Sequence, residues 1–281
     1  MSVRPHVVYL SSSAHSDWRE PVKLKYRNDD RVIFVGPCEQ HGLSDAMGAP
    51  GDMKPGHKLR IMQMLSKSDI LFGYIPDDHY RSFNIMLEIG IGRAWGRKIC
   101  FVNEASSLAE EVRCTQPYVD ESCDSLSAGL DRLHQLVAAD SSDFYENGGR
   151  GPEVQQLLKP TGCVEHRIHL SGSSDPAWAN RVQAHYRAHA AVTLSVEEDI
   201  DALANSDILL ACRTSDEGRL FNLSLAVGYA SALGKRILFV NEGDHYSHAY
   251  DYIKPFSDGY FTNLDDGLRY LDYAVGIEDR L

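Results

Sequence analysis

The sequence contains two copies of one 38-residue pattern, and this repeat is the feature that most constrains the fold. Residues 68–105 read SDILFGYIPDDHYRSFNIMLEIGIGRAWGRKICFVNEA, and residues 206–243 read SDILLACRTSDEGRLFNLSLAVGYASALGKRILFVNEG. The two segments align without a gap at an offset of 138 and agree at 17 of 38 positions. Such agreement over a short window indicates an internal duplication, so both halves are expected to adopt one fold.

The repeat extends toward the amino terminus of each copy at a different offset. Residues 7–27 match residues 167–187 at an offset of 160, with Leu10 and Trp18 recurring as Leu170 and Trp178. The offset therefore falls by 22 residues between the two matches, which is the length of the Gly/Pro-rich segment 36–57. We expect the second copy to lack this segment.

Short apolar runs alternate with amphipathic segments in both copies. In the first copy we expect strands at 7–10, 32–35, 70–75 and 98–102, and helices at 17–27, 58–66, 82–95 and 126–138. This alternation predicts an α/β fold with a doubly wound parallel sheet in each copy. The expected domains are 1–140 and 164–281, joined by a linker at 141–163 that is rich in turn-forming residues.

Composition limits the partners that the chain is expected to have. A net charge of −12 and a pI near 5.4 argue against binding to a nucleic acid polymer, which needs clustered Lys and Arg. The sequence has no run of 18 or more apolar residues and no signal-peptide pattern. We expect a cytoplasmic protein with reduced cysteines and no membrane partner.

Glu88 is the main candidate for chemistry, because it stands in an otherwise apolar helical segment and is replaced by Ala226 in the second copy. A buried glutamate is costly unless it is paired or used, and burial raises its pKa by desolvation. Such a carboxylate can exchange protons or attack carbon. The alternatives are a solvated helix residue, or a carboxylate paired with Arg60 or Arg93.

Further polar candidates lie where ligands bind in open α/β sheets, at the carboxyl ends of the strands. They occupy the serine turn after the first strand, the loop 36–57, the turn 76–78 and the helix that carries Glu88. These candidates are Ser11, Ser13, His15, His41, Asp45, Asp77, Asp78 and Asn84. Several also have a structural explanation: turn or capping chemistry for Asp77 and Asp78, helix capping and packing for Asn84, and a solvated excursion for the loop.

Two motifs of the first copy resemble the YtoQ family of small proteins. They are VYLSSSAHSDWRE at 8–20 and VGPCEQHGLSDAMG at 35–48. YtoQ proteins are similar in turn to nucleoside 2-deoxyribosyltransferases, which have a flavodoxin-like fold and a glutamate nucleophile in a pattern like E-x-G-x-A. Here that pattern is EIGIG at 88–92. The resemblance covers residues 6–138 and, weakly, 166–278, and it implies two tandem flavodoxin-like domains.

The resemblance also implies an activity. Glu88 would attack the anomeric carbon of a nucleoside or nucleotide, the base would leave after protonation, and a second base or water would attack the glycosyl-enzyme ester. Tyr9 would lie near the nucleophile, and Asp78 or Asp77 would orient it. No metal or other cofactor is needed.

Members of the resembled family are oligomers in which a neighbouring subunit completes the site. The second copy is therefore expected to serve as a built-in partner, giving an intramolecular pseudo-dimer that leaves room for further homo-oligomers.

Two other functions stay open from the sequence. One is a nucleoside 5′-monophosphate N-glycosidase, a hydrolase, since Ser11 to Ser13 and Arg19 could accept a phosphate. The other is a non-catalytic nucleotide-binding protein, in which Glu88 is a relic and both copies serve packing.

Overall fold

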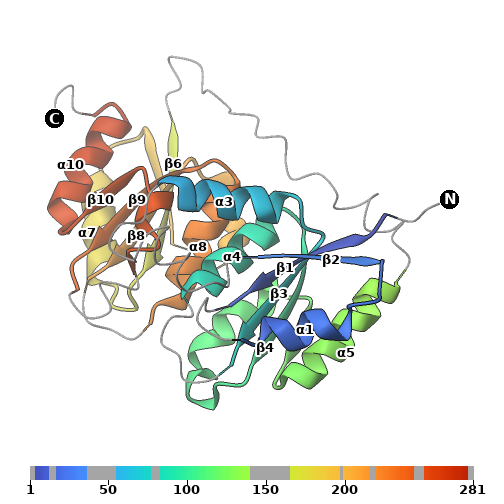
Figure 1. Cartoon of the computed structure of the whole chain (residues 1–281). Helices are drawn as coiled ribbons and strands as arrows, with labels where there is room; N and C mark the ends of the chain where they lie inside the picture. Colours follow the sequence, from blue (N-terminus) through green and yellow to red (C-terminus); the bar gives the residue numbers. More distant parts are fainter. Residues whose placement is uncertain are drawn as a thin grey trace.

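The computed structural model describes residues 4–12, 17–36, 55–76, 83–139, 165–196, 199–214, 219–243 and 250–277. The chain forms two five-stranded parallel sheets, one in each half (Figure 1). The first has the order β2-β1-β3-β4-β5 and the second β10-β9-β8-β6-β7, so corresponding strands occupy corresponding places. This order is the flavodoxin-like one, which confirms the predicted fold class.

The strands of the first sheet are β1 (His6–Ser11), β2 (Val32–Val35), β3 (Ile70–Ile75), β4 (Lys98–Asn103) and β5 (Glu121–Cys123). Those of the second are β6 (His166–Gly172), β7 (Val192–Ser195), β8 (Ile208–Arg213), β9 (Arg236–Asn241) and β10 (Gly259–Phe261). Val8 pairs with Ile70 in the first sheet, and Ile168 pairs with Ile208 in the second. Ile168 corresponds to Val8 at the offset of 160, and Ile208 corresponds to Ile70 at the offset of 138, so the strand pairing reproduces both offsets of the sequence repeat. The structural repeat therefore follows the sequence repeat residue by residue.

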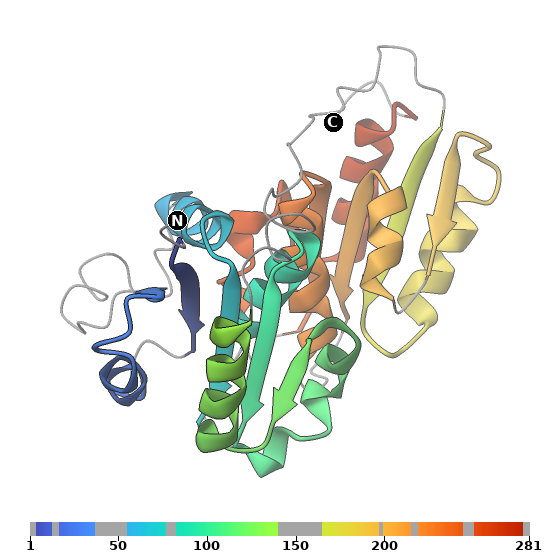
Figure 2. The same ribbon diagram turned by 90° about the vertical axis from the view of Figure 1, so that its right-hand side faces the viewer.

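Helices cover both faces of each sheet (Figures 1 and 2). On the first sheet, α1 (Arg19–Lys25) and α5 (Leu126–Ala138) cover one face, and α3 (Pro55–Ser66) and α4 (Phe83–Ala94) the other. On the second, α7 (Ala177–Tyr186) and α10 (Leu264–Ala274) cover one face and α8 (Phe221–Ala232) the other. Short 3-10 helices are η2 (Ser106–Leu108), η3 (Glu111–Tyr118), η4 (Ile200–Asn205) and η5 (Lys254–Phe256).

The hydrophobic core has three parts, and the central one is shared by both halves. Each outer part lies between one sheet and its outer helices. The central part combines Leu71 and Ile89 of the first half with Leu209 and Val227 of the second. The two sheets are therefore joined through a common layer of helices, in which α4 and α8 lie side by side.

Glycines allow α4 and α8 to cross at very short distance. A Cβ atom at Gly90 would overlap the carbonyl oxygen of Leu225, and a Cβ atom at Gly228 would overlap the carbonyl oxygen of Leu87. Gly90 and Gly228 are equivalent in the repeat, as are Leu87 and Leu225. The crossing is thus self-complementary, like the interface of a twofold dimer.

Polar contacts surround this crossing. Arg93 pairs with Asp201 at 2.7 Å, and the indole Nε1 of Trp95 donates to the carbonyl oxygen of Ala232 at 3.2 Å. At the crossing's other end the rings of Phe83 and its repeat equivalent Phe221 meet edge to face, with centroids 5.3 Å apart. The second half therefore packs directly on the helix that carries Glu88.

The domain boundaries and the linker stay predictions, because residues 140–164 lie outside the described residues. In the described ranges, no helix is both long and apolar enough to cross a membrane.

We predict that Gly90→Ala lowers the free energy of unfolding by about 2 kcal/mol or more, because the new methyl group meets backbone that cannot move aside. The matched control is Gly92→Ala on the same helix, where a Cβ atom would lie 3.3 Å from a side-chain methyl group of Leu71. Denaturant unfolding of both variants measures the difference. Equal losses would contradict the close crossing.

Candidate functional site

Glu88 lies in the second turn of α4, between the first sheet and α8. Only 4% of its surface is exposed, and its neighbours along the helix are buried apolar residues and glycines. The helix follows β3 and begins at the carboxyl edge of the first sheet. The carboxylate is therefore buried at the edge where ligands of open α/β sheets bind.

Two side chains of β1 hold the carboxylate. The hydroxyl of Tyr9 donates to Oε1 of Glu88 at 2.7 Å, and the hydroxyl of Ser11 donates to Oε2. Alternate residues of a strand project to the same face, so Tyr9 and Ser11 both reach toward α4. Both are fully buried, which makes the three residues one hydrogen-bonded cluster.

Burial dominates the ionisation of this cluster. It raises the pKa of Glu88 from 4.5 to about 7, although the hydrogen bonds from Ser11 and Tyr9 and the charge of Arg19 act in the opposite direction. The pKa of Tyr9 is raised well above 10, first by burial and then by the adjacent Glu88 charge. Tyr9 therefore remains a hydrogen-bond donor at neutral pH, while Glu88 is divided between its two protonation states.

Two arginines complete the electrostatic environment. Arg19 of α1 and Arg60 of α3 both lower the pKa of Tyr9, against the larger effects of burial and Glu88. Arg93, considered above as a partner of Glu88, instead forms its ion pair with Asp201 of the second half. That alternative was wrong because the contact depends on how the two halves pack, which sequence spacing does not reveal.

The second half lacks this cluster. His169 replaces Tyr9 and hydrogen-bonds through Nδ1 to Ser195 at 2.9 Å, while Ala226 replaces Glu88. Its buried helix α8 carries no acidic residue. The carboxylate chemistry available to this arrangement is therefore confined to the first half.

Other carboxylates recur in both halves and have structural roles. Asp69 accepts a hydrogen bond from the backbone N–H of Val7 at 2.8 Å, and its equivalent Asp207 accepts one from Arg167 at 2.9 Å. Asp69 thereby links the start of β3 to β1, and Asp207 links the start of β8 to β6. Glu88 differs from them because it is unrepeated and its carboxylate accepts from two side chains.

The structure brings together only part of the predicted site. Glu88, Tyr9 and Ser11 meet, and Asn84 is half-buried one turn before Glu88 on the same helix. The remaining predicted residues lie outside the described part of the chain; they are Ser13, His15, His41, Asp45, Asp77 and Asp78. Arg19 was considered only as a contact for a phosphate; its action on Glu88 and Tyr9 was missed, since a charged residue at the start of an amphipathic helix suggests exposure.

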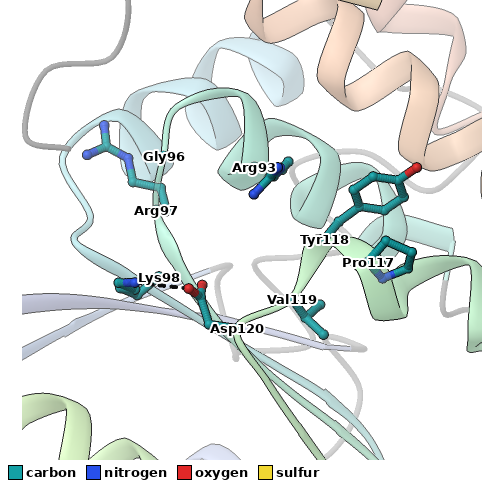
Figure 3. Close-up of a pocket in the computed structure, with 8 residues that line it drawn as sticks. All are labelled: Arg93, Gly96, Arg97, Lys98, Pro117, Tyr118, Val119 and Asp120. Carbon is teal, nitrogen blue, oxygen red and sulfur yellow. Dashed lines mark hydrogen bonds and ion pairs between the residues drawn. The ribbon is translucent and has the colours of Figure 1, made fainter. Parts of the chain in front are cut away.

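A separate cavity of about 200 Å³ lies at the opposite edge of the first sheet, near the start of β4 (Figure 3). Its charged groups already have partners. Lys98 pairs with Asp120 at 3.0 Å, and Arg97 donates to the carbonyl oxygen of Ser66 at 2.9 Å. Figure 3 shows the Arg97 side chain pointing away from Tyr118. The residues that line this cavity do not include Tyr9, Ser11 or Glu88.

Comparison with known proteins finds one informative similarity. The chain is 27% identical over 140 residues to the uncharacterized protein YtoQ of Bacillus subtilis (strain 168), covering 43% of this chain and 94% of the relative. No known family model matches the chain. The similarity supports a YtoQ-like segment, and the name of the relative assigns no activity.

Solved structures add no argument about function. The GsuK channel matches with a TM-score of 0.27 and 13% identity, over 98% of this chain and 70% of the channel chain. A ketoreductase domain from the bacillaene assembly line matches with a TM-score of 0.26 and 10% identity, over 98% and 78% of the two chains.

We predict that Glu88→Gln changes how stability depends on pH. The raised pKa means that the folded chain favours the neutral carboxyl group, a contribution that is complete below pH 4.5 and lost as the pH rises through about 7. Between about pH 5 and pH 8, the unfolding free energy of the wild type should fall by about 3 kcal/mol relative to the variant. Urea unfolding across this range provides the measurement, and parallel curves would show that the pKa of Glu88 is ordinary.

Proposed function

We propose that the first half cleaves or transfers the N-glycosidic bond of a nucleoside or nucleotide, with Glu88 as the nucleophile. The observation that carries the proposal is the buried Glu88 carboxylate, held by Tyr9 and Ser11 at the ligand-binding edge of the sheet. A nucleophilic carboxylate must be oriented and stripped of water, and this cluster provides both conditions. The resemblance of the surrounding motifs to YtoQ and the deoxyribosyltransferases supports the same reaction.

The reaction has two balanced steps. In the first, an oxygen of the Glu88 carboxylate forms a bond to C1′ of the sugar, the C1′–N bond breaks, and the base leaves with its electron pair and takes up a proton. In the second, water or another base attacks C1′, loses a proton, and releases the carboxylate. The hydrogen bond from Tyr9 fixes the orientation of the carboxylate during both steps.

A nucleoside 5′-monophosphate is the second candidate substrate, with water as the acceptor. Arg19 and Arg60 both act electrostatically on the Tyr9 hydroxyl, so two cationic side chains lie near the cluster despite the acidic chain. Cationic side chains near a site favour an anionic ligand. A non-catalytic nucleotide-binding protein is the remaining alternative, in which ligands stabilise the fold and are not turned over.

We predict that the protein releases or exchanges the base of at least one member of a panel of ribo- and deoxyribonucleosides and their 5′-monophosphates. Each would be incubated with and without a free acceptor base, and base release followed by chromatography. Glu88→Ala should abolish turnover, because the proposed ester forms on the Glu88 carboxylate. Equal turnover by wild type and variant would exclude Glu88, and ligand-induced stabilisation without turnover would favour the binding protein.

A covalent intermediate provides the direct test of the nucleophile. A 2′-fluorinated analogue of the active substrate should accumulate as an ester, because fluorine slows departure through an oxocarbenium-like transition state. Intact-mass measurement should show one added glycosyl group, and peptide mapping should locate it at Glu88. A glycosyl group found on another residue would assign the role of nucleophile to that residue.

We predict that the rate rises with pH through about 7, because the attacking form of Glu88 is the carboxylate. Tyr9→Phe should move this rise to higher pH, since the lost hydrogen bond had favoured the charged form. The profile of kcat/KM for the two proteins measures the shift. A rate that falls as Glu88 ionises would instead assign it the role of a general acid.

A further inference from the structure

Arg19 and Arg213 are the two largest fully buried side chains among the described residues, and 1% of the surface of Arg19 is exposed. It is the first residue of α1, and its guanidinium lies over the ring of Trp18 at 5.1 Å. An arginine is rarely buried to this extent without a specific role, because removing its charge from water is costly. We therefore expect the contacts of the Arg19 guanidinium to have a specific role.

The guanidinium holds the end of β1 on both sides of Ser11. Its Nη2 donates to the carbonyl oxygen of Ser12 at 3.1 Å, and its Nε makes a longer hydrogen bond of 3.4 Å to that of Leu10. The pairing of β1 with β2 ends at Tyr9, whereas its pairing with β3 continues to Ser11, so Arg19 supports the end of β1 on the side that β2 no longer covers. The residue between the two carbonyls is the one whose hydroxyl donates to Glu88.

The second half shows that the fold itself does not need this arginine. Ala179 occupies the equivalent position in α7, although the neighbouring tryptophan is retained as Trp178. There the end of β6 is fastened through Ser173, which accepts from Trp178 Nε1 at 3.1 Å and donates its backbone N–H to the carbonyl oxygen of Cys212 at 2.9 Å. The arginine is thus absent from the half that also lacks the carboxylate.

We propose that Arg19 is a positioning residue for Glu88: by holding the carbonyl groups on either side of Ser11, it fixes the hydroxyl that hydrogen-bonds the carboxylate. The role is electrostatic as well as geometric, because Arg19 acts on Glu88 and on Tyr9. The inference rests on the proposed function only in taking Glu88 as the reacting group. The ionisation of Glu88 can be measured without any substrate.

The other charged and titratable groups around the cluster come from three elements. Tyr9 of β1 contacts Glu88 directly, and Arg60 of α3 acts on Tyr9. On α8, which packs against α4, the titratable residue is Tyr229, and it interacts with Asp201 and Arg93. Arg19 differs from Arg60 in that it is one of the groups that lower the pKa of Glu88 itself.

The test is the titration of Glu88 in full-length protein carrying 13C-labelled glutamate. The side-chain carboxyl resonance is assigned by its disappearance in Glu88→Gln. Arg19→Met should raise the pKa of Glu88 by about one unit, because both a nearby charge and the support of Ser11 are lost. Arg27→Met, which removes an exposed arginine just beyond α1, is the matched control and should leave the titration unchanged.

A double-variant comparison separates positioning from charge alone. In a Ser11→Ala background the shift caused by Arg19→Met should shrink, because the hydroxyl that Arg19 positions is gone. An equal shift in both backgrounds would overturn the positioning role, and a titration matching that of Arg27→Met would overturn the whole proposal. Should Arg19→Met not fold, Arg19→Lys is measured instead; it keeps the charge but not the paired hydrogen bonds, and an unchanged pKa would contradict the proposal.

Discussion

The close crossing of α4 and α8 is the constraint on which the rest of the structure depends. Glycine at both Gly90 and Gly228 lets the two backbones touch, and this contact joins two sheets that would otherwise have separate cores. It also encloses α4 between the first sheet and the second half. The Glu88 carboxylate is held on the side of the first sheet, by Tyr9 and Ser11 of β1.

Most of the fold could be predicted from the sequence, because the repeat and the alternating periodicities specify the same architecture. The helix at 126–138 was predicted at its observed bounds, whereas α1 is shorter than its predicted range of 17–27. The strands β5 and β10 were missed, since three residues are too few to show an alternating pattern. Their place at the sheet edge is fixed by pairing with β4 and β9, which is a tertiary effect.

The candidate site was predictable in part. Glu88 could be found because a charge in an apolar helix is unusual and because the second copy lacks it. The resemblance placed Tyr9 near it, but no sequence pattern gives the hydrogen bonds that Tyr9 and Ser11 make to opposite oxygens. The pair of Arg93 and Asp201 was inaccessible to sequence reasoning, because its partners are brought together only when the halves pack.

The ionisation of Glu88 reflects opposing effects whose sizes can be compared. A rise in pKa from 4.5 to about 7 corresponds to about 3 kcal/mol against the carboxylate, which remains after Ser11, Tyr9 and Arg19 have offset part of the cost of burial. Without these groups the carboxyl would be neutral at physiological pH and a poor nucleophile. In the second copy Tyr9, Arg19 and Glu88 are replaced together by His169, Ala179 and Ala226. This joint replacement is expected if the three residues act together electrostatically, because neither the tyrosine nor the arginine is needed in the second copy once the carboxylate is absent.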